Sequence, residues 1–162
     1  MPPKGPVFGA ILADYLKQIE GLPNPAAIAA RLGAAWKDGR YLIPFFERRY
    51  AVEARRMADE AGAPPGHAAA VILAKYLLLC PARPVEDPTL VTYRDFRDAA
   101  PYAGGFKNTV ERPIARHFSG RIEDLGRRSR QLEGKPFPTD AAYQLAFRFQ
   151  ALPRVAVFLL FN

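Results

Sequence analysis

The chain has 162 residues, of which 49% are hydrophobic and 12% aromatic, and its 23 basic and 16 acidic residues give a formal net charge of +7. This length and apolar content exclude intrinsic disorder and predict a globular chain with a core of its own. The single cysteine, Cys80, excludes an internal disulfide, a cysteine-rich zinc site and a self-contained iron–sulfur cluster. It favours a reducing, cytoplasmic location. No stretch reaches the roughly 18 apolar residues of a membrane span.

The chain is expected to begin with two helices, after residues 1–6, whose three prolines predict a loose arm. Apolar side chains recur at helical spacing over residues 8–19, and Gly21 ends the pattern. A shorter helix is predicted over residues 25–32, because Asn24 is a good N-cap and proline is favoured at a first helical position.

Strands are expected next, because the composition becomes rich in aromatic and branched residues after Arg40. We predict two short strands that turn near residues 47–49, with a helix over residues 50–57 as the alternative. Pro44 restricts the first strand to an edge or a bulge. Residues 67–80 are nearly all apolar and predict a central buried helix without a broad wet face.

The last part of the chain predicts a basic amphipathic helix and a hairpin. The apolar stripe of the helix comprises Ile122, Leu125, Ser129 and Leu132. From Ala142 the alternation predicts a half-buried strand, and a turn over residues 151–154 leads to a last strand that is apolar on both faces and therefore expected to be central. A central strand needs neighbours on both edges. A second copy in a homodimer, the earlier strands, or a C-terminal segment missing after Asn162 would supply them.

Together these elements predict an α+β fold. We expect a single domain over residues 7–162, in which several helices pack on a small, mainly antiparallel sheet with a C-terminal hairpin. The positive charge favours anionic partners, and we expect no membrane partner.

Charged and aromatic residues are densest at residues 93–112. Thr92 and Asp95 have the spacing of a capping box, so we expect Asp95 to tie down the start of a helix that runs to Ala99 or Ala100. A candidate carboxylate cluster for acid–base chemistry or metal binding comprises Asp95, Asp98 and Glu111. The neighbouring arginines, Arg94 and Arg97, favour ion pairs instead.

A candidate anion site lies in the second half of this stretch. The glycine pair predicts a loop that leads into a helix starting at Asn108 or Thr109, because Pro113 is tolerated only near a first turn. Such a loop can point several backbone N–H groups at an anion. The predicted ligand-binding residues are Gly104, Gly105, Lys107, Asn108 and Arg112. The alternative is an ordinary turn, since no phosphate-loop pattern is present.

The run RDFRDAAPYAGGF over residues 94–106, followed by Asn108 and Glu111, resembles a signature of the domain-of-unknown-function family 3786, found mostly in anaerobic bacteria and archaea. The resemblance extends from about Phe45 to Asn162. It implies a role in anaerobic metabolism. It also implies an acidic segment after the last strand, and with this segment the net charge of the complete protein would be lower than +7. The family has no established catalytic residues, so the resemblance assigns no catalytic role to any residue of this chain.

Three functions stay open from the sequence. The first is a binding or accessory module for an anionic small ligand or cofactor of unknown identity. The second is an enzyme that uses the carboxylate cluster with His117, although the apolar spacing around His117 favours a hydrogen-bonded core histidine. The third is nucleic-acid binding through the basic helix. We rank it last, because the arginines of this helix spread around its circumference and do not form one patch. Two histidines far apart in the sequence predict no metal site.

Overall fold

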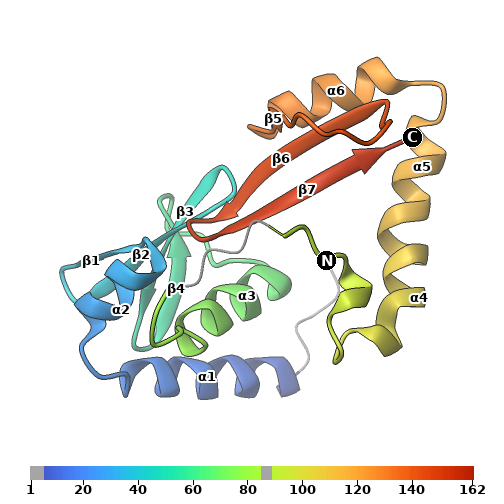
Figure 1. Ribbon diagram of the computed structural model, residues 1–162. Helices are drawn as coiled ribbons and strands as arrows, with labels where there is room; N and C mark the ends of the chain where they lie inside the picture. The colour runs from blue at the N-terminus through green and yellow to red at the C-terminus, as the bar shows by residue number, and fades with distance from the viewer. Residues whose placement is uncertain (1–5, 85–88) are drawn as a thin grey trace. The chain divides into compact units, whose positions relative to one another are not determined.

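The structure is a computed structural model that describes residues 6–84 and 89–162 (Figure 1). Its helices and antiparallel sheets confirm the α+β class. The chain divides into two compact units, and their ranges are Met1–Val85 with Phe149–Val157, and Glu86–Arg148 with Phe158–Asn162. The predicted loose arm lies mostly outside the described residues. The single domain expected over residues 7–162 stays a prediction.

The first unit is an antiparallel four-stranded sheet with helices packed on it. Its elements are α1 (Pro6–Glu20), α2 (Pro25–Leu32), β1 (Ala35–Lys37), β2 (Arg40–Phe45), β3 (Arg48–Glu53), β4 (Arg56–Asp59) and α3 (His67–Leu78). The strands follow the order β1-β2-β3-β4, and each is antiparallel to the next. The two opening helices and the strand pair β2 and β3 are confirmed. The short outer strands β1 and β4 were not predicted from the sequence.

Local chemistry explains where these elements start and stop. The Asn24 side chain accepts a hydrogen bond from the backbone N–H of Ala27 at 3.3 Å, and Gly33 ends α2 with a φ of 69°. Both are standard helix caps. Strand β1 pairs only as far as Leu42, so Pro44 lies where β2 has no neighbour on that side among the described strands. The predicted edge position of this proline is therefore confirmed locally.

Helix α3 packs only one face into the core of the first unit. It contacts α1 and α2, and its buried residues are Ala70, Leu73, Ala74 and Leu77. This i, i+3, i+4, i+7 spacing defines a single helix face. On another face, Ile72 is 41% exposed, and Leu79 just after the helix is 70% exposed. The predicted central buried helix is therefore buried on one face only, because an apolar sequence does not by itself supply a partner for every face.

The second unit holds the remaining helices and a three-stranded sheet. Its elements are η1 (Tyr93–Asp95), η2 (Ala100–Tyr102), α4 (Ala103–Phe106), the π-helical turn η3 (Lys107–Glu111), α5 (Arg112–Phe118), α6 (Ile122–Gln131), β5 (Lys135–Pro136), β6 (Leu145–Leu152) and β7 (Val155–Phe161). Strands β6 and β7 form the predicted hairpin and contribute residues to both units.

Strand β7 lies at an edge of its sheet, whose order is β5-β6-β7. The expectation of a central strand is therefore wrong for the described strands, and Val155 and Val157 are 43% and 46% exposed. Its completion by a second copy or by a further segment stays a prediction. No helix in the described part of the chain has the length and apolar content to cross a membrane.

Helix α6 is the predicted basic amphipathic helix. It buries Leu125 and Ser129, and a Cβ added to Gly126 would lie 3.4 Å from Leu145 Cδ1 of β6. The Asp124 carboxylate accepts hydrogen bonds from Arg121 Nε at 3.1 Å and from Arg127 Nη2 at 2.5 Å. The bond from Arg121, followed by the positive charge of Arg127, lowers the pKa of Asp124.

One member of the predicted apolar stripe does not belong to α6. Leu132 follows the last helical residue and is 54% exposed. The helix ends before this residue, so the helical spacing that placed it on the buried face no longer applies.

Candidate functional site

The predicted anion-binding loop is a helix. Gly104 and Gly105 lie inside α4, and Asn108 lies in the π-helical turn η3 rather than at a helix start. The N–H of Lys107 bonds back to carbonyls of α4, and Arg112 Nη1 donates to Asn108 Oδ1 at 2.8 Å. Backbone N–H groups that bond within a helix cannot point at an anion, so this geometry corrects the expected loop.

Pro113 is the reason why the sequence predicted a loop and a helix start at this position. A proline lacks an N–H group, and in an α-helix its ring clashes with the carbonyl four residues earlier, which is that of Thr109. The chain widens into the π-helical turn Lys107–Glu111 directly before α5, so Pro113 lies in the first turn of α5 but follows a wider helical turn instead of a loop. Binding of a ligand by the predicted residues of this segment stays a prediction, and all of them are exposed.

Asp95 caps its helical turn as predicted. Its Oδ2 accepts a hydrogen bond from the Thr92 N–H at 2.5 Å, while Thr92 Oγ1 accepts one from the Arg94 N–H at 3.3 Å. The bonds from the backbone and side chain of Thr92 lower the pKa of Asp95. The element itself is shorter than expected, because η1 ends at Asp95 instead of continuing to Ala99.

The other two carboxylates of the candidate cluster have different surroundings. Asp98 is exposed, and no ion pair joins it to Arg94 or Arg97 in the described part of the chain. Glu111 lines a small cavity of about 220 Å³ together with Thr92 and Arg94. Among residues 6–84 and 89–162, no three His, Cys, Asp or Glu side chains gather as a metal ion would require. A shared catalytic role of the three carboxylates stays a prediction.

His117 does not occupy the core position that its spacing suggests. It is exposed on α5, and its ring stands edge-on to Phe118 with 4.6 Å between the ring centroids. Neighbouring Ile114 and Phe118 are only half-buried, so this helix presents no deep apolar face where the histidine lies.

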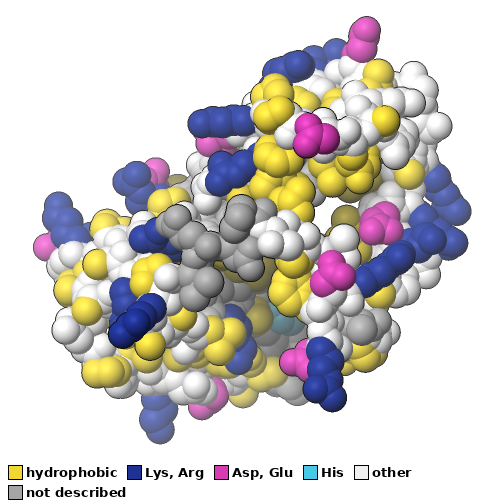
Figure 2. All heavy atoms as spheres, viewed as in Figure 1, with side chains coloured by type: hydrophobic (Ala, Val, Ile, Leu, Met, Phe, Trp, Pro, Cys, Tyr) yellow, Lys and Arg dark blue, Asp and Glu magenta, His cyan; other side chains and the backbone are white. Residues whose placement is uncertain are grey.

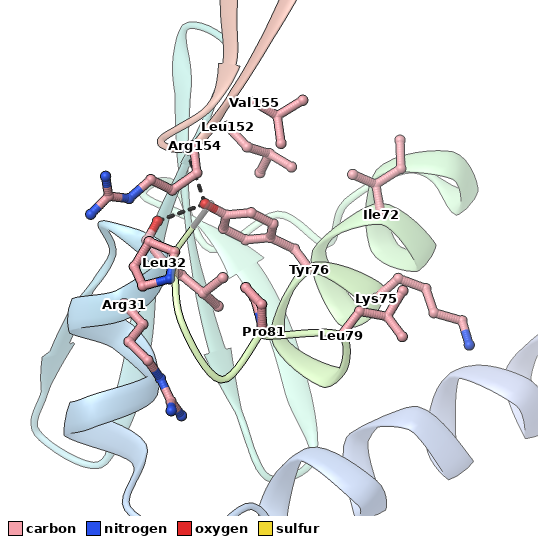
Figure 3. A pocket seen from close by; sticks show the side chains of 11 residues that line it. Arg31, Leu32, Ile72, Lys75, Tyr76, Leu79, Pro81, Leu152, Arg154 and Val155 are labelled. Atoms are coloured by element: carbon pink, nitrogen blue, oxygen red, sulfur yellow. Dashed lines mark hydrogen bonds between the residues drawn. The ribbon is translucent and has the colours of Figure 1, made fainter. Parts of the chain in front are cut away.

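The larger cavity lies in the first unit and has a volume of about 410 Å³ (Figure 3). Helices α2 and α3, the segment after α3 and the β6–β7 hairpin contribute its lining. Its apolar side chains are Leu32, Ile72, Leu79, Pro81, Pro84, Leu152 and Val155. Its cations are Arg31, Lys75 and Arg154. Tyr76 completes the described lining, so apolar walls carry a few polar groups, as in most small-molecule sites.

Tyr76 connects three segments around this cavity. Its hydroxyl donates a hydrogen bond to the Leu32 carbonyl at the end of α2, at 2.6 Å, and accepts one from the backbone N–H of Arg154 in the hairpin turn, at 3.1 Å. Burial raises the pKa of this hydroxyl, because the charged form loses water. The tyrosine thus fixes the cavity walls relative to each other.

The three cations differ in their surroundings. Lys75 Nζ lies 4.8 Å from the centre of the Tyr15 ring, a cation–π contact. Arg31 Nη1 reaches the Ala82 carbonyl at 3.5 Å, and Arg31 Nε is buried without a hydrogen-bond partner among the described residues. Figure 3 shows the charged ends of Arg31, Lys75 and Arg154 pointing to different sides of an apolar centre. Arg31 therefore keeps unused donor capacity beside the cavity.

This cavity was not predicted, although the sequence contains one signal for it. Arg31 and Lys75 are the only charged residues in the otherwise apolar helices α2 and α3. A lone cation on an apolar helix is worth testing as a ligand contact. Arg154, in contrast, lies in a hairpin turn, where a charged residue is ordinary.

Nucleic-acid binding through the basic helix stays a prediction. Figure 2 shows Lys and Arg side chains scattered, with acidic side chains among them. At α6, the Asp124 carboxylate forms ion pairs with Arg127 on the helix and with Arg121 directly before it.

Comparisons with known proteins identify a family but no activity. A family model described as "Domain of unknown function (DUF3786)" matches residues 24–162. This match confirms the resemblance carried by residues 94–111 and extends it towards the N-terminus, to the cap of α2. No curated protein and no solved structure matches the chain.

Proposed function

The chain belongs to the DUF3786 family, whose description assigns no function, and we propose that it is a binding module that holds a small anionic ligand in the 410 Å³ cavity of the first unit. The observation that carries this proposal is the combination of three cations with an apolar lining. No carboxylate occurs among the lining residues that the structure describes. A local excess of positive charge in a hollow with low-dielectric walls attracts anions.

Binding is favoured over catalysis by the state of Tyr76. Its hydroxyl already donates to Leu32 and accepts from Arg154, and its raised pKa keeps the proton in place. The remaining polar groups of the described lining are Arg and Lys side chains, which orient an anion through charge and hydrogen bonds. We keep the cytoplasm as the expected location, on the ground of the single cysteine.

Thermal unfolding with a panel of anions tests this proposal. The panel comprises inorganic phosphate, citrate, adenosine monophosphate and octanoate. A ligand that binds only the folded chain stabilises it by an amount that grows with concentration, about 2.7 kcal/mol at a hundred times Kd. We expect at least one member to raise the Tm, and Arg31→Gln to reduce this rise.

Two further variants locate the site. Arg49→Gln is the matched control, because Arg49 is an exposed arginine of the same unit and pairs with Glu60 away from the cavity. It should leave the rise unchanged. Arg112→Ala tests the site predicted from the sequence. A rise that is lost in Arg112→Ala and kept in Arg31→Gln would overturn the proposed location, and a Tm that no anion changes would overturn the function.

A further inference from the structure

We infer that the ligand is a monocarboxylate with an unbranched aliphatic chain, an inference that rests on the proposed binding function. The walls that such a chain would contact are aliphatic side chains of α2, α3, the segment after α3 and the hairpin, with the ring of Tyr76 between them (Figure 3). Three of these aliphatic residues are strongly exposed: Ile72 is 41%, Leu79 70% and Val155 43% exposed.

The exposed wall residues favour an apolar ligand over a compact polar one. Exposed aliphatic side chains line this one hollow. The free energy falls when the aliphatic chain of a ligand removes them from water. They come from α3, from the segment that follows it and from β7, so together they border the hollow on more than one side. A phosphate or citrate ion would leave these side chains in water. Chain length should therefore decide affinity.

The acid group of the ligand is best placed at Arg31. Arg31 lines the cavity, its side chain is only half-buried, and the hydrogen bond from its Nη1 to the Ala82 carbonyl is long at 3.5 Å. Lys75, in contrast, is engaged with the Tyr15 ring. A planar guanidinium pairs with a carboxylate through two parallel hydrogen bonds.

One acid group suits this cavity better than several. The charged ends of Arg31, Lys75 and Arg154 point to different sides in Figure 3, with apolar side chains between them. A small polyanion at one cation would place its remaining charges against apolar walls, which costs free energy. A single carboxylate with an apolar tail avoids this cost.

Titration calorimetry of the full chain with hexanoate, octanoate and decanoate, each below its micelle-forming concentration, tests the inference. We expect the affinity to rise about fourfold for each added methylene group. Octan-1-ol, which has the same chain without the charge, should bind about tenfold more weakly than octanoate. Inorganic phosphate is the chain-free anion.

Three variants assign the two ends of the ligand. Arg31→Gln should weaken octanoate about tenfold and leave octan-1-ol unchanged. Leu79→Asp is a second variant that should fold normally, because Leu79 is 70% exposed. Its added carboxylate should repel octanoate and weaken the binding of octanoate much more than that of octan-1-ol. Arg49→Gln, on the surface of the same unit, should behave as the wild type.

The outcomes separate this inference from the proposed function. Equal affinity for phosphate and octanoate, both lost in Arg31→Gln, would keep the anion site and overturn the aliphatic chain. Equal affinity for octan-1-ol and octanoate, unaffected by Arg31→Gln, would overturn the carboxylate. If no carboxylate, alcohol or phosphate binds and the wider anion panel leaves the Tm unchanged, the inference and the proposed function both fail.

Discussion

Tyr76 is the residue on which the walls of the larger cavity depend. Its one hydroxyl is donor to α2 and acceptor for the hairpin turn, so two segments that lie far apart in the sequence meet at one oxygen atom. Removing it would leave the Leu32 carbonyl and the Arg154 N–H without this partner. Unmade hydrogen bonds at partly buried groups cost more than the bond itself contributes.

We therefore predict that Tyr76→Phe lowers the free energy of unfolding by about 1 to 2 kcal/mol at pH 7. Because the folded chain raises the pKa of Tyr76, the contribution of the neutral hydroxyl is fully present below the ordinary value of 10.0 and is lost as the pH rises through the higher folded value. Urea unfolding of both proteins between pH 7 and pH 11 checks this. The wild type should lose more stability than the variant above pH 10. Parallel pH curves would contradict the assignment.

At the scale of single residues, the sequence was informative where a role depends on close neighbours. The cap formed by Thr92 and Asp95 could be predicted, because both partners lie within one turn. The exposed position of His117 could not, since it depends on what packs against α5.

At the scale of elements, the glycine that ends α2 has both a local and a tertiary role. Gly33 has a φ of 69°, in the left-handed region that other residues adopt at a cost, and a Cβ at this position would lie 3.0 Å from Pro153 Cβ of the hairpin turn. Gly39 also has a positive φ, of 75°, but nothing lies within 4 Å of its would-be Cβ. Substitution of Gly39 therefore tests backbone strain alone, whereas substitution of Gly33 tests backbone strain together with crowding against Pro153.

We predict that Gly33→Ala destabilises the chain more than Gly39→Ala does. Each substitution places a side chain in the left-handed region, at a cost of about 1 to 2 kcal/mol. Only the first also pushes against Pro153, a rigid ring that cannot rotate away. Chemical denaturation of both variants measures the difference. Equal losses would show that the hairpin turn moves aside without cost.

The helices and strands themselves follow from the sequence to differing degrees. The caps of α2 and the alternation in β6 are local signals, and they predicted those elements correctly. The π-helical turn before Pro113 was missed, because a proline pattern does not distinguish a helix start from a helix that widens to accept the ring.

At the scale of the whole molecule, the C-terminal hairpin belongs to both compact units. Ala151 accepts a hydrogen bond from the N–H of Phe46 at 2.9 Å, and Leu152 is buried in the core built by α1, α2, α3 and the four-stranded sheet. The first unit therefore includes residues from the last part of the chain. Its fold depends on a contact that only long-range packing creates.

We predict that Leu152→Ala lowers the free energy of unfolding by about 3 kcal/mol, because it leaves a cavity in that core. Leu132→Ala is the matched control, since Leu132 is 54% exposed, and its effect should stay within about 0.5 kcal/mol. Urea denaturation followed by circular dichroism compares the two. Similar small effects would mean that the hairpin contributes little to the first unit.

The sequence by itself determined the α+β class, the two opening helices, the strand pair β2 and β3, the hairpin and the family, because periodicity, caps and motifs act between residues that are close along the chain. The tertiary structure decided which apolar faces stay uncovered, that β7 lies at an edge, and that Arg31, Tyr76 and Arg154 meet at one cavity. These features depend on packing between segments separated by 44 to 78 residues, as the two hydrogen bonds of Tyr76 show. No local pattern encodes such a separation.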